Sequence, residues 1–205
     1  MTKRSLRSCG WREKVVRSQN KIFFKMGKSK KEIKFLVLGP AKSGKTTFIK
    51  QLEVPHNYRH GISSFQYLEK YRPYIYKNIF KAIQTLIRGM EQFQIEYESP
   101  ESRQRASSIS AIKVENVTTF DMVFLGEDIK ELCNDLGIAE CYFRLGDNPS
   151  LTSAQYYFAN IDRISMPDYV PNKQDIILDY TPTKTTIEHS FDMETILHNS
   201  STGYG

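Results

Sequence analysis

The sequence contains no hydrophobic run long enough to cross a bilayer, and it contains few cysteines. A transmembrane helix needs about 20 consecutive apolar residues, whereas apolar runs here, such as 35–38 and 122–125, have four. The three cysteines, Cys9, Cys133 and Cys141, are an odd number without a C-x-x-C pair. This spacing argues against a zinc or redox motif and favours a reducing, cytoplasmic setting. With 40% hydrophobic and 12% aromatic residues, a packed globular core is expected.

Acidic residues are scarce only at the N-terminus. Residues 1–31 hold eleven Lys and Arg against one Glu, a net charge of +10, while the remainder holds 18 basic and 22 acidic residues, a net charge of −4. Three interpretations of this basic arm stay open. It is a solvated, largely disordered tail, or a peripheral membrane contact with Cys9 as a palmitoylation candidate, or a nucleic-acid or organelle-targeting segment. No nucleic-acid partner is expected for the chain as a whole.

A strand, a glycine loop and a helix follow the arm. Residues 33–38 form a short apolar run rich in β-formers, which predicts a buried strand ending at Gly39. Apolar positions then predict a helix from Lys45, which Pro55 is expected to stop.

The loop carries the pattern G-x-x-x-x-G-K-[ST] in residues 39–46. Its glycines allow the backbone to fold around phosphate, so that amides and the helix N-terminus face the anion. Lys45 would bring a positive charge to the β- and γ-phosphates, and the Thr46 hydroxyl would ligate Mg²⁺. Because the motif stands between a strand and a helix, as a phosphate-binding loop (P-loop) requires, it predicts nucleotide binding.

The rest of the chain is dominated by helical patterns. Apolar residues recur every three or four positions over 65–93, which predicts a long amphipathic helix whose start Pro73 kinks or shifts. Residues 98–110 are polar and rich in serine, which predicts a loop. Further helices are predicted at 120–132 and 153–164, and a strand at 186–191.

Residues around and beyond the loop resemble the α subunits of heterotrimeric G proteins. The similarity lies in segments 34–39 and 45–51, which match K-x-L-L-L-G-x-G-E-S-G-K-S-T-x-x-K-Q, and in segments 132–138, 153–158, 162–164 and 169–176. The resemblance spans about residues 32–193. It implies an α/β P-loop NTPase fold, Ras-like and truncated after its second strand, with an inserted all-α helical domain.

The resemblance also implies a domain organisation. Residues 1–31 would be the basic arm, 32–60 the P-loop strand and helix, and 61–170 the helical domain. Residues 171–197 would be the linker, switch I and second strand, and 198–205 a polar tail. The chain stops where the resemblance would place the third strand and its D-x-x-G motif, so it is interpreted as an N-terminal fragment of such a subunit.

Site residues follow from the resemblance by position. The cofactors would be GTP or GDP with Mg²⁺, and Thr46 and Thr183 would be the metal ligands, with Thr185 as the alternative to Thr183. The nucleotide-lining positions would be Lys42, Ser43, Gly44, Lys45, Thr46, Thr47, Ser153, Leu178 and Thr183.

Two departures from the family pattern bear on catalysis. The catalytic arginine position is occupied by Tyr180, and a second arginine position by Leu178. The loop glutamate that pairs with the arginine is replaced by Lys42. An arginine in this role contributes roughly 10³ to 10⁵ in kcat, so weak or absent GTP hydrolysis is expected, with no catalytic residue assigned.

Three functions remain open. The first is a G-protein α-like signal transducer at the cytoplasmic face of the plasma membrane, with βγ subunits and a G-protein-coupled receptor as partners. The second is a non-enzymatic interaction module that uses the helical domain or the basic arm, and the third is an unstable truncated product. Residues 172–175 spell N-K-x-D, the base-reading motif of GTPases, yet no buried strand precedes them, so we interpret the match as a coincidence.

Overall fold

The computed structural model describes residues 12–15, 21–26, 33–40, 43–59 and 64–179. The chain divides into two compact units, Met1–Glu53 and Val54–Gly205. Helix α2 (Lys45–Arg59) begins in the first unit and ends in the second. Among the described residues, no helix combines the length and apolar character needed to cross a membrane.

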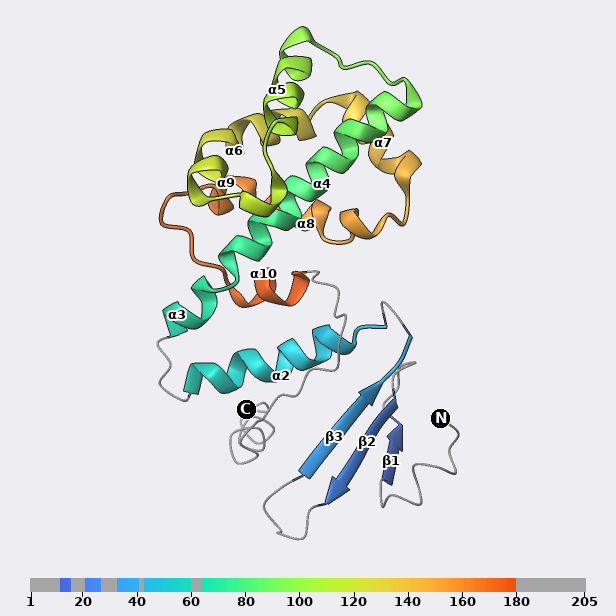
Figure 1. Ribbon diagram of the computed structural model, residues 1–205, viewed down its shortest axis with the longest axis vertical. Coiled ribbons are helices and arrows are strands. Elements are labelled where there is room, and N and C mark those ends of the chain that lie inside the picture. The colour runs from blue at the N-terminus through green and yellow to red at the C-terminus, as the bar shows by residue number, and fades with distance from the viewer. Residues whose placement is uncertain (1–11, 16–20, 27–32, 41–42, 60–63, 180–205) are drawn as a thin grey trace, which may run out of the picture. The chain divides into compact units, whose positions relative to one another are not determined.

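The first unit holds a three-stranded antiparallel sheet in the order β1-β2-β3 (Figure 1). Its strands are β1 (Arg12–Val15), β2 (Lys21–Met26) and β3 (Ile33–Leu38). The predicted strand at 33–38 is thus confirmed, but it is not buried as expected, because Leu36 and Val37 are partly buried and Leu38 is exposed. Strands β1 and β2 belong to the basic arm, where no strand was predicted, so these residues are not a disordered tail. Parallel pairing, as in a Ras-like sheet, does not occur among the described strands. The predicted strand at 186–191 lies outside the described residues.

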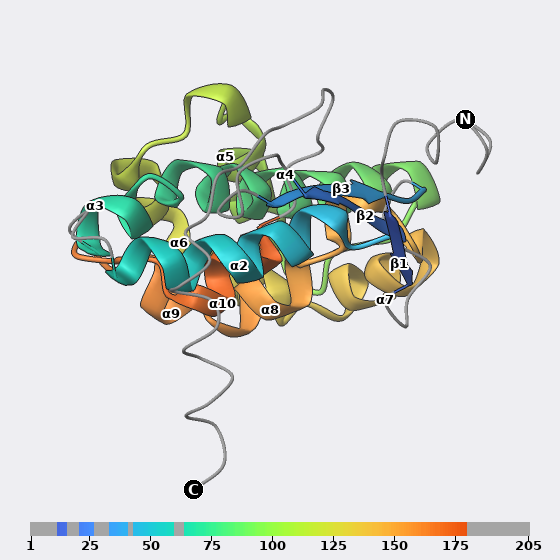
Figure 2. The same ribbon diagram turned by 90° about the horizontal axis from the view of Figure 1, so that it is seen from below.

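The second unit is helical, and its helix α4 runs through the middle of the others (Figures 1 and 2). The longer helices are α4 (Arg72–Phe93), α5 (Pro100–Ser110), α6 (Thr119–Cys133) and α7 (Leu136–Leu145). The shorter ones are α3 (Ser64–Glu69), η1 (Val114–Asn116), η2 (Pro149–Leu151), α8 (Ala154–Ala159), α9 (Ile161–Ile164) and α10 (Lys173–Leu178).

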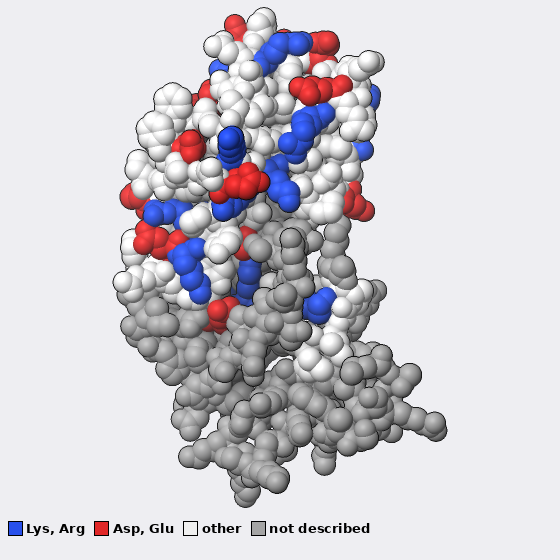
Figure 3. All heavy atoms as spheres, viewed as in Figure 1, with Lys and Arg blue, Asp and Glu red and all other residues white. Residues whose placement is uncertain are grey.

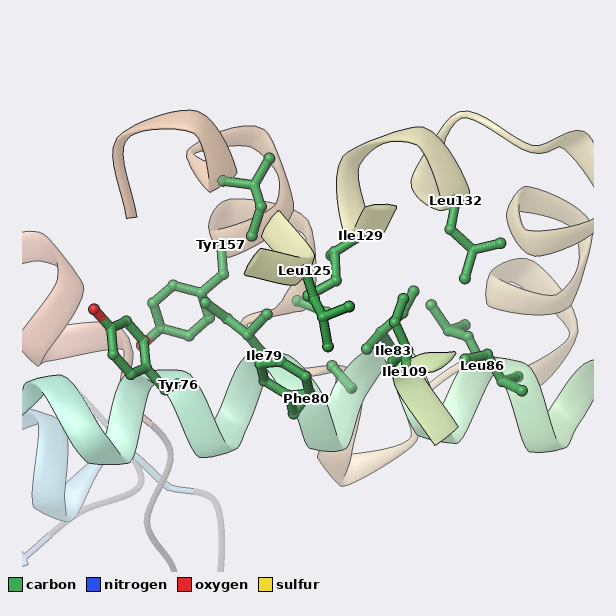
Figure 4. Close-up of a cluster of buried hydrophobic side chains, with 14 of the residues drawn as sticks. Tyr76, Ile79, Phe80, Ile83, Leu86, Ile109, Leu125, Ile129, Leu132 and Tyr157 are labelled. Atoms are coloured by element: carbon green, nitrogen blue, oxygen red, sulfur yellow. The ribbon is translucent and has the colours of Figure 1, made fainter. Parts of the chain in front are cut away.

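The apolar stripe of α4 is the centre of the core. Its side chains are almost completely buried and point toward residues of α5, α6 and α8 (Figure 4). The α4 residues in this core include Ile75, Ile79, Phe80, Ile83, Leu86 and Met90, and their neighbours include Ile109, Leu125, Ile129, Leu132 and Tyr157. Burying one such side chain contributes about 1.5–3 kcal/mol. At Gly89, an added Cβ would lie 2.5 Å from the Cys141 Sγ, so glycine allows α7 to approach α4 closely.

Side-chain caps fix where two of these helices begin. Thr118 and Asp121 form a capping box at the start of α6. Asp135 caps α7 by accepting a hydrogen bond from the Gly137 amide at 2.9 Å, and it also accepts one from the Glu98 amide at 3.0 Å. The buried Asp135 carboxylate therefore joins the start of α7 to the connection between α4 and α5.

Several sequence-based boundaries were wrong. Helix α2 continues past Pro55 to Arg59. The proline removes one helical hydrogen bond, the one that the Gln51 carbonyl would accept, and the helix tolerates this loss because Gln51 is exposed to water. The predicted loop at 98–110 contains α5, since Ser99 accepts a hydrogen bond from the Ser102 amide and Pro100 suits the first helical position. The polar composition of α5 concealed two apolar residues, Ala106 and Ile109, that are buried in the core.

The remaining helical predictions are confirmed with breaks. The helix predicted over 65–93 is divided into α3 and α4, and α4 begins at Arg72 with Pro73 in its first turn. The helix predicted at 120–132 is α6. The one predicted at 153–164 is interrupted at Asn160, whose φ of −112° is not helical, and this break separates α8 from α9.

We predict that Ile83→Ala lowers the free energy of unfolding by about 2–5 kcal/mol, because the substitution leaves a cavity at a fully buried position. Lys81→Ala, at an exposed position of the same helix, should change it by less than about 0.5 kcal/mol. Urea denaturation followed by the helical circular dichroism signal measures both. Equal effects of the two substitutions would contradict the proposed core.

Candidate functional site

The phosphate-binding motif lies between β3 and α2, where the sequence predicted it. Strand β3 ends at Leu38, Gly39 and Pro40 are exposed, and α2 begins at Lys45. Gly44 has a φ of +81°, a conformation that residues with a Cβ rarely adopt. Its carbonyl accepts the first hydrogen bond of α2, from the Phe48 amide at 2.9 Å. Glycine is therefore required at the turn that starts the helix.

The Lys45 side chain folds back over the loop. Its ammonium Nζ donates hydrogen bonds to the carbonyls of Gly39 at 2.9 Å and Pro40 at 2.6 Å, and it lies 3.4 Å from the Ser43 hydroxyl. These contacts hold a positive charge beside the N-terminus of α2. Since helix N-termini attract anions, the charge and the helix favour the same kind of ligand.

The loop residues fit a nucleotide phosphate. The glycine turn and the first turn of a 15-residue helix are the kind of backbone that phosphate-binding loops use, and the Lys45 ammonium lies beside them. Thr46 and Thr47 stand in that first turn, where Thr46 would hold Mg²⁺ when nucleotide is bound. Lys42 and Thr183 lie outside the described residues, as do Thr185 and Tyr180. The described residues contain no group of three or more His, Cys, Asp or Glu that could hold a metal.

The helical unit brings together the other two predicted lining residues. The Ser153 hydroxyl donates to the Leu178 carbonyl at 2.5 Å. Next to this contact, the Asn78 side-chain amide donates to the Asp179 carboxylate at 2.6 Å, and Asp179 is buried. Asn78 of α4 and Ser153, the residue that precedes α8, therefore both hold the C-terminal end of α10. Sequence reasoning missed Asn78 and Asp179, because their contact joins positions 101 residues apart and has no local pattern.

A buried carboxylate anchors the other end of α10. Asp175 is fully buried, and Arg163 donates to both of its carboxylate oxygens, at 2.8 and 2.9 Å. The hydroxyls of Tyr156 and Tyr169 donate to it at 2.7 and 3.0 Å, and the Asn172 amide at 2.8 Å. With five hydrogen bonds converging on it, the Asp175 carboxylate is engaged inside the helical unit.

Residues 172–175 form a helix cap. The Asn172 side chain accepts from the Asp175 amide at 2.9 Å while Asp175 accepts from the Asn172 amide, so the two residues make a reciprocal capping box at the start of α10. The interpretation of N-K-x-D as a coincidental match is supported, because the aspartate faces protein donors. The Asn-x-x-Asp spacing was the sequence signal for this cap.

The electrostatics of the network favour an ionised aspartate. Burial by itself would raise the pKa of Asp175, but hydrogen bonds from Arg163, the Asn172 amide and Tyr156 outweigh it and hold the pKa below its usual value. Burial and the nearby Asp175 charge raise the pKa of Tyr169, so its hydroxyl stays protonated and continues to donate.

The cysteines of the helical unit, Cys133 and Cys141, are packing groups. Cys141 is fully buried and donates to the Leu86 carbonyl at 3.3 Å. Burial raises the pKa of Cys133 to about 12, which keeps it a thiol at neutral pH.

We predict that Asp175→Asn lowers the free energy of unfolding by about 2–4 kcal/mol at neutral pH. In the variant, an amide NH₂ would face hydrogen-bond donors from which a carboxylate oxygen now accepts, so these donors would lose their acceptor. The exposed Asp168→Asn is the matched control. Because the folded-state pKa of Asp175 is lowered, its contribution is present above the unfolded pKa of about 3.9 and is lost as pH falls below it. Denaturation curves at pH 7 and pH 3 should therefore show a difference between variant and wild type that shrinks in acid. An unchanged stability at pH 7, or a changed preference of GTP over ATP, would contradict this role.

Comparison with known protein families agrees with this geometry. A family model described as G-protein alpha subunit matches residues 13–202, which include the P-loop and all the described helices of the helical unit. The match covers most of the chain, and family membership brings with it a P-loop nucleotide-binding fold combined with a helical domain. The chain therefore belongs to the G-protein α subunit family and is a G-protein α-like signal transducer.

Proposed function

We propose that this chain binds the phosphates of GDP and GTP through its P-loop and hydrolyses GTP slowly. The observation that carries the proposal is the position of the Lys45 ammonium, held by the Gly39 and Pro40 carbonyls beside the N-terminus of α2. A phosphate entering this loop would meet the ammonium and the first-turn amides together. Thr46, and Thr183 or Thr185, would complete the Mg²⁺ shell with phosphate oxygens and water.

Slow hydrolysis follows from the residues at the arginine and glutamate positions. Tyr180 is neutral and cannot supply the charge that an arginine places on the transferring phosphoryl group. Losing that charge costs about 4–7 kcal/mol of transition-state stabilisation, which corresponds to 10³ to 10⁵ in rate. Lys42 replaces the glutamate that pairs with this arginine in the family pattern, so both residues of that ion pair are replaced in this chain.

In the signalling cycle, such a protein would stay in its GTP-bound state longer than a rapidly hydrolysing relative. The partners proposed from the family are βγ subunits and a G-protein-coupled receptor at the cytoplasmic face of the plasma membrane. The basic arm, which contains β1 and β2, would support attachment to anionic lipid. The contacts of Ser153 and Asn78 would position the segment that carries Tyr180, because they hold the two residues directly before it.

We predict that Lys45→Ala weakens binding of a fluorescent GTP analogue by at least about tenfold, because a charged hydrogen bond contributes about 1.5–3 kcal/mol. Gln51→Ala, at an exposed position further along α2, should leave the affinity within about twofold. Equilibrium titration in the presence of Mg²⁺ measures both. Unchanged binding in the Lys45 variant would remove the P-loop from the account.

We also predict that single-turnover hydrolysis of bound GTP is at least about 10³-fold slower than in an α subunit that carries the arginine. Phosphate release is measured from the preloaded full chain, and the Lys45→Ala variant defines the background. A rate comparable with that of the arginine-bearing α subunit would show that Tyr180 does not limit turnover.

A further inference from the structure

The outer face of α6 carries an aromatic pair that the fold does not use. The Phe120 and Phe124 side chains are 74% and 72% exposed, and their rings stack with centroids 5.9 Å apart and planes at 9°. Val123, on the same side of the helix, is 40% exposed. The inner face of α6 is already complete, since Met122, Leu125, Ile129 and Leu132 are buried in the core.

Neither phenyl ring is explained by helix stability. Phenylalanine has a lower helix propensity than alanine, and an exposed ring gains little from burial. Contiguous apolar surface bordered by polar residues is typical of protein interaction sites. Aromatic residues are also over-represented at the centres of such interfaces.

Acidic side chains continue the same stripe along the helix. Glu127 and Glu131 are exposed and follow Phe120 and Phe124 at helical spacing. The sequence of α6 holds four acidic residues and one lysine, a net charge of −3. That lysine, Lys130, lies 2.9 Å from Asp162 of α9, and its longer contact with Glu127 is 3.9 Å. The stripe is therefore apolar at its N-terminal half and acidic at its C-terminal half.

We propose that the α6 stripe (Phe120, Val123, Phe124, Glu127 and Glu131) docks a basic amphipathic helix of a partner protein. The partner would place apolar side chains over the phenyl pair and Lys or Arg beside the two glutamates. Phe124 and Glu131 are seven positions apart, so these two contacts are about 10 Å apart along the helix. Pairs of helices pack side by side at this spacing by setting ridges into grooves.

The charges of the stripe argue against other kinds of partner. Anionic lipid and nucleic acid would both be repelled by Glu127 and Glu131. On the face drawn in Figure 3, acidic and basic side chains of the helical unit are interspersed and form no field of one sign. Recognition would therefore depend on the local match between α6 and its partner rather than on long-range attraction.

The test uses the full chain and two synthetic 18-residue helical peptides with leucine on one face. One peptide carries lysine at its polar positions and the other carries glutamate. Fluorescence anisotropy titration should show binding of the lysine peptide and at least about tenfold weaker binding of the glutamate peptide. Phe120→Ala/Phe124→Ala should weaken binding of the lysine peptide at least about tenfold. Glu127→Lys/Glu131→Lys should weaken it severalfold at low salt.

Phe143→Ala is the matched control, because Phe143 is 81% exposed on another helix, α7. It should leave binding within about twofold, and thermal melting of all variants should stay near the wild type. The proposal is overturned if the lysine peptide does not bind, if the control weakens binding as much as the α6 pair, or if both peptides bind equally. Sedimentation that shows a dimer abolished by Phe120→Ala/Phe124→Ala would assign the stripe to a second copy and would also overturn it.

Discussion

The burial of the apolar stripe of α4 is the constraint on which the helical unit depends. Ile75, Ile79, Ile83, Leu86 and Met90 lie on one face of a single 22-residue helix, and helices α5, α6, α7 and α8 gain buried surface by packing against it. Without this stripe, the short helices could not fold, since helices of about six residues are unstable alone in water. The most polar of the longer helices, α5, is also held by this packing through Ile109.

The same helix also contacts the C-terminal end of α10. Asn78, on α4, holds the Asp179 carboxylate, while Ser153 holds the Leu178 carbonyl and the Asp175 network anchors the start of α10. The apolar residues Tyr67 and Leu68 of α3 pack against Ile176 between these two anchors. A six-residue helix is thus fixed by contacts from several others, immediately before the segment that carries Tyr180.

Sequence reasoning found the features that have a local pattern. The strand at 33–38, the glycine loop and the amphipathic α4 are defined by spacing within a few residues. The structure places the strand and the loop where they were predicted, and it divides the predicted long helix into α3 and α4. The helix α5 was missed because only two of its apolar side chains face the core, so its periodicity was weak. The contacts of Asn78 with Asp179 and of Arg163 with Asp175 join distant residues, and no single-sequence pattern indicates them. Strand β1 was hidden by its charged composition, whereas β2 has four apolar residues among six and was overlooked because it lies within the basic arm.

The central claim is that the P-loop of this family member receives nucleotide phosphate at the N-terminus of α2. The most direct measurement is the set of backbone amide chemical shifts in the full chain, recorded by NMR with and without Mg²⁺-GDP. The account predicts large shifts for the amides of Gly44, Lys45 and Thr46, and unchanged shifts for core residues such as Ile83. Saturating GDP that left the three loop amides unmoved, or that shifted only residues of the helical core, would contradict it.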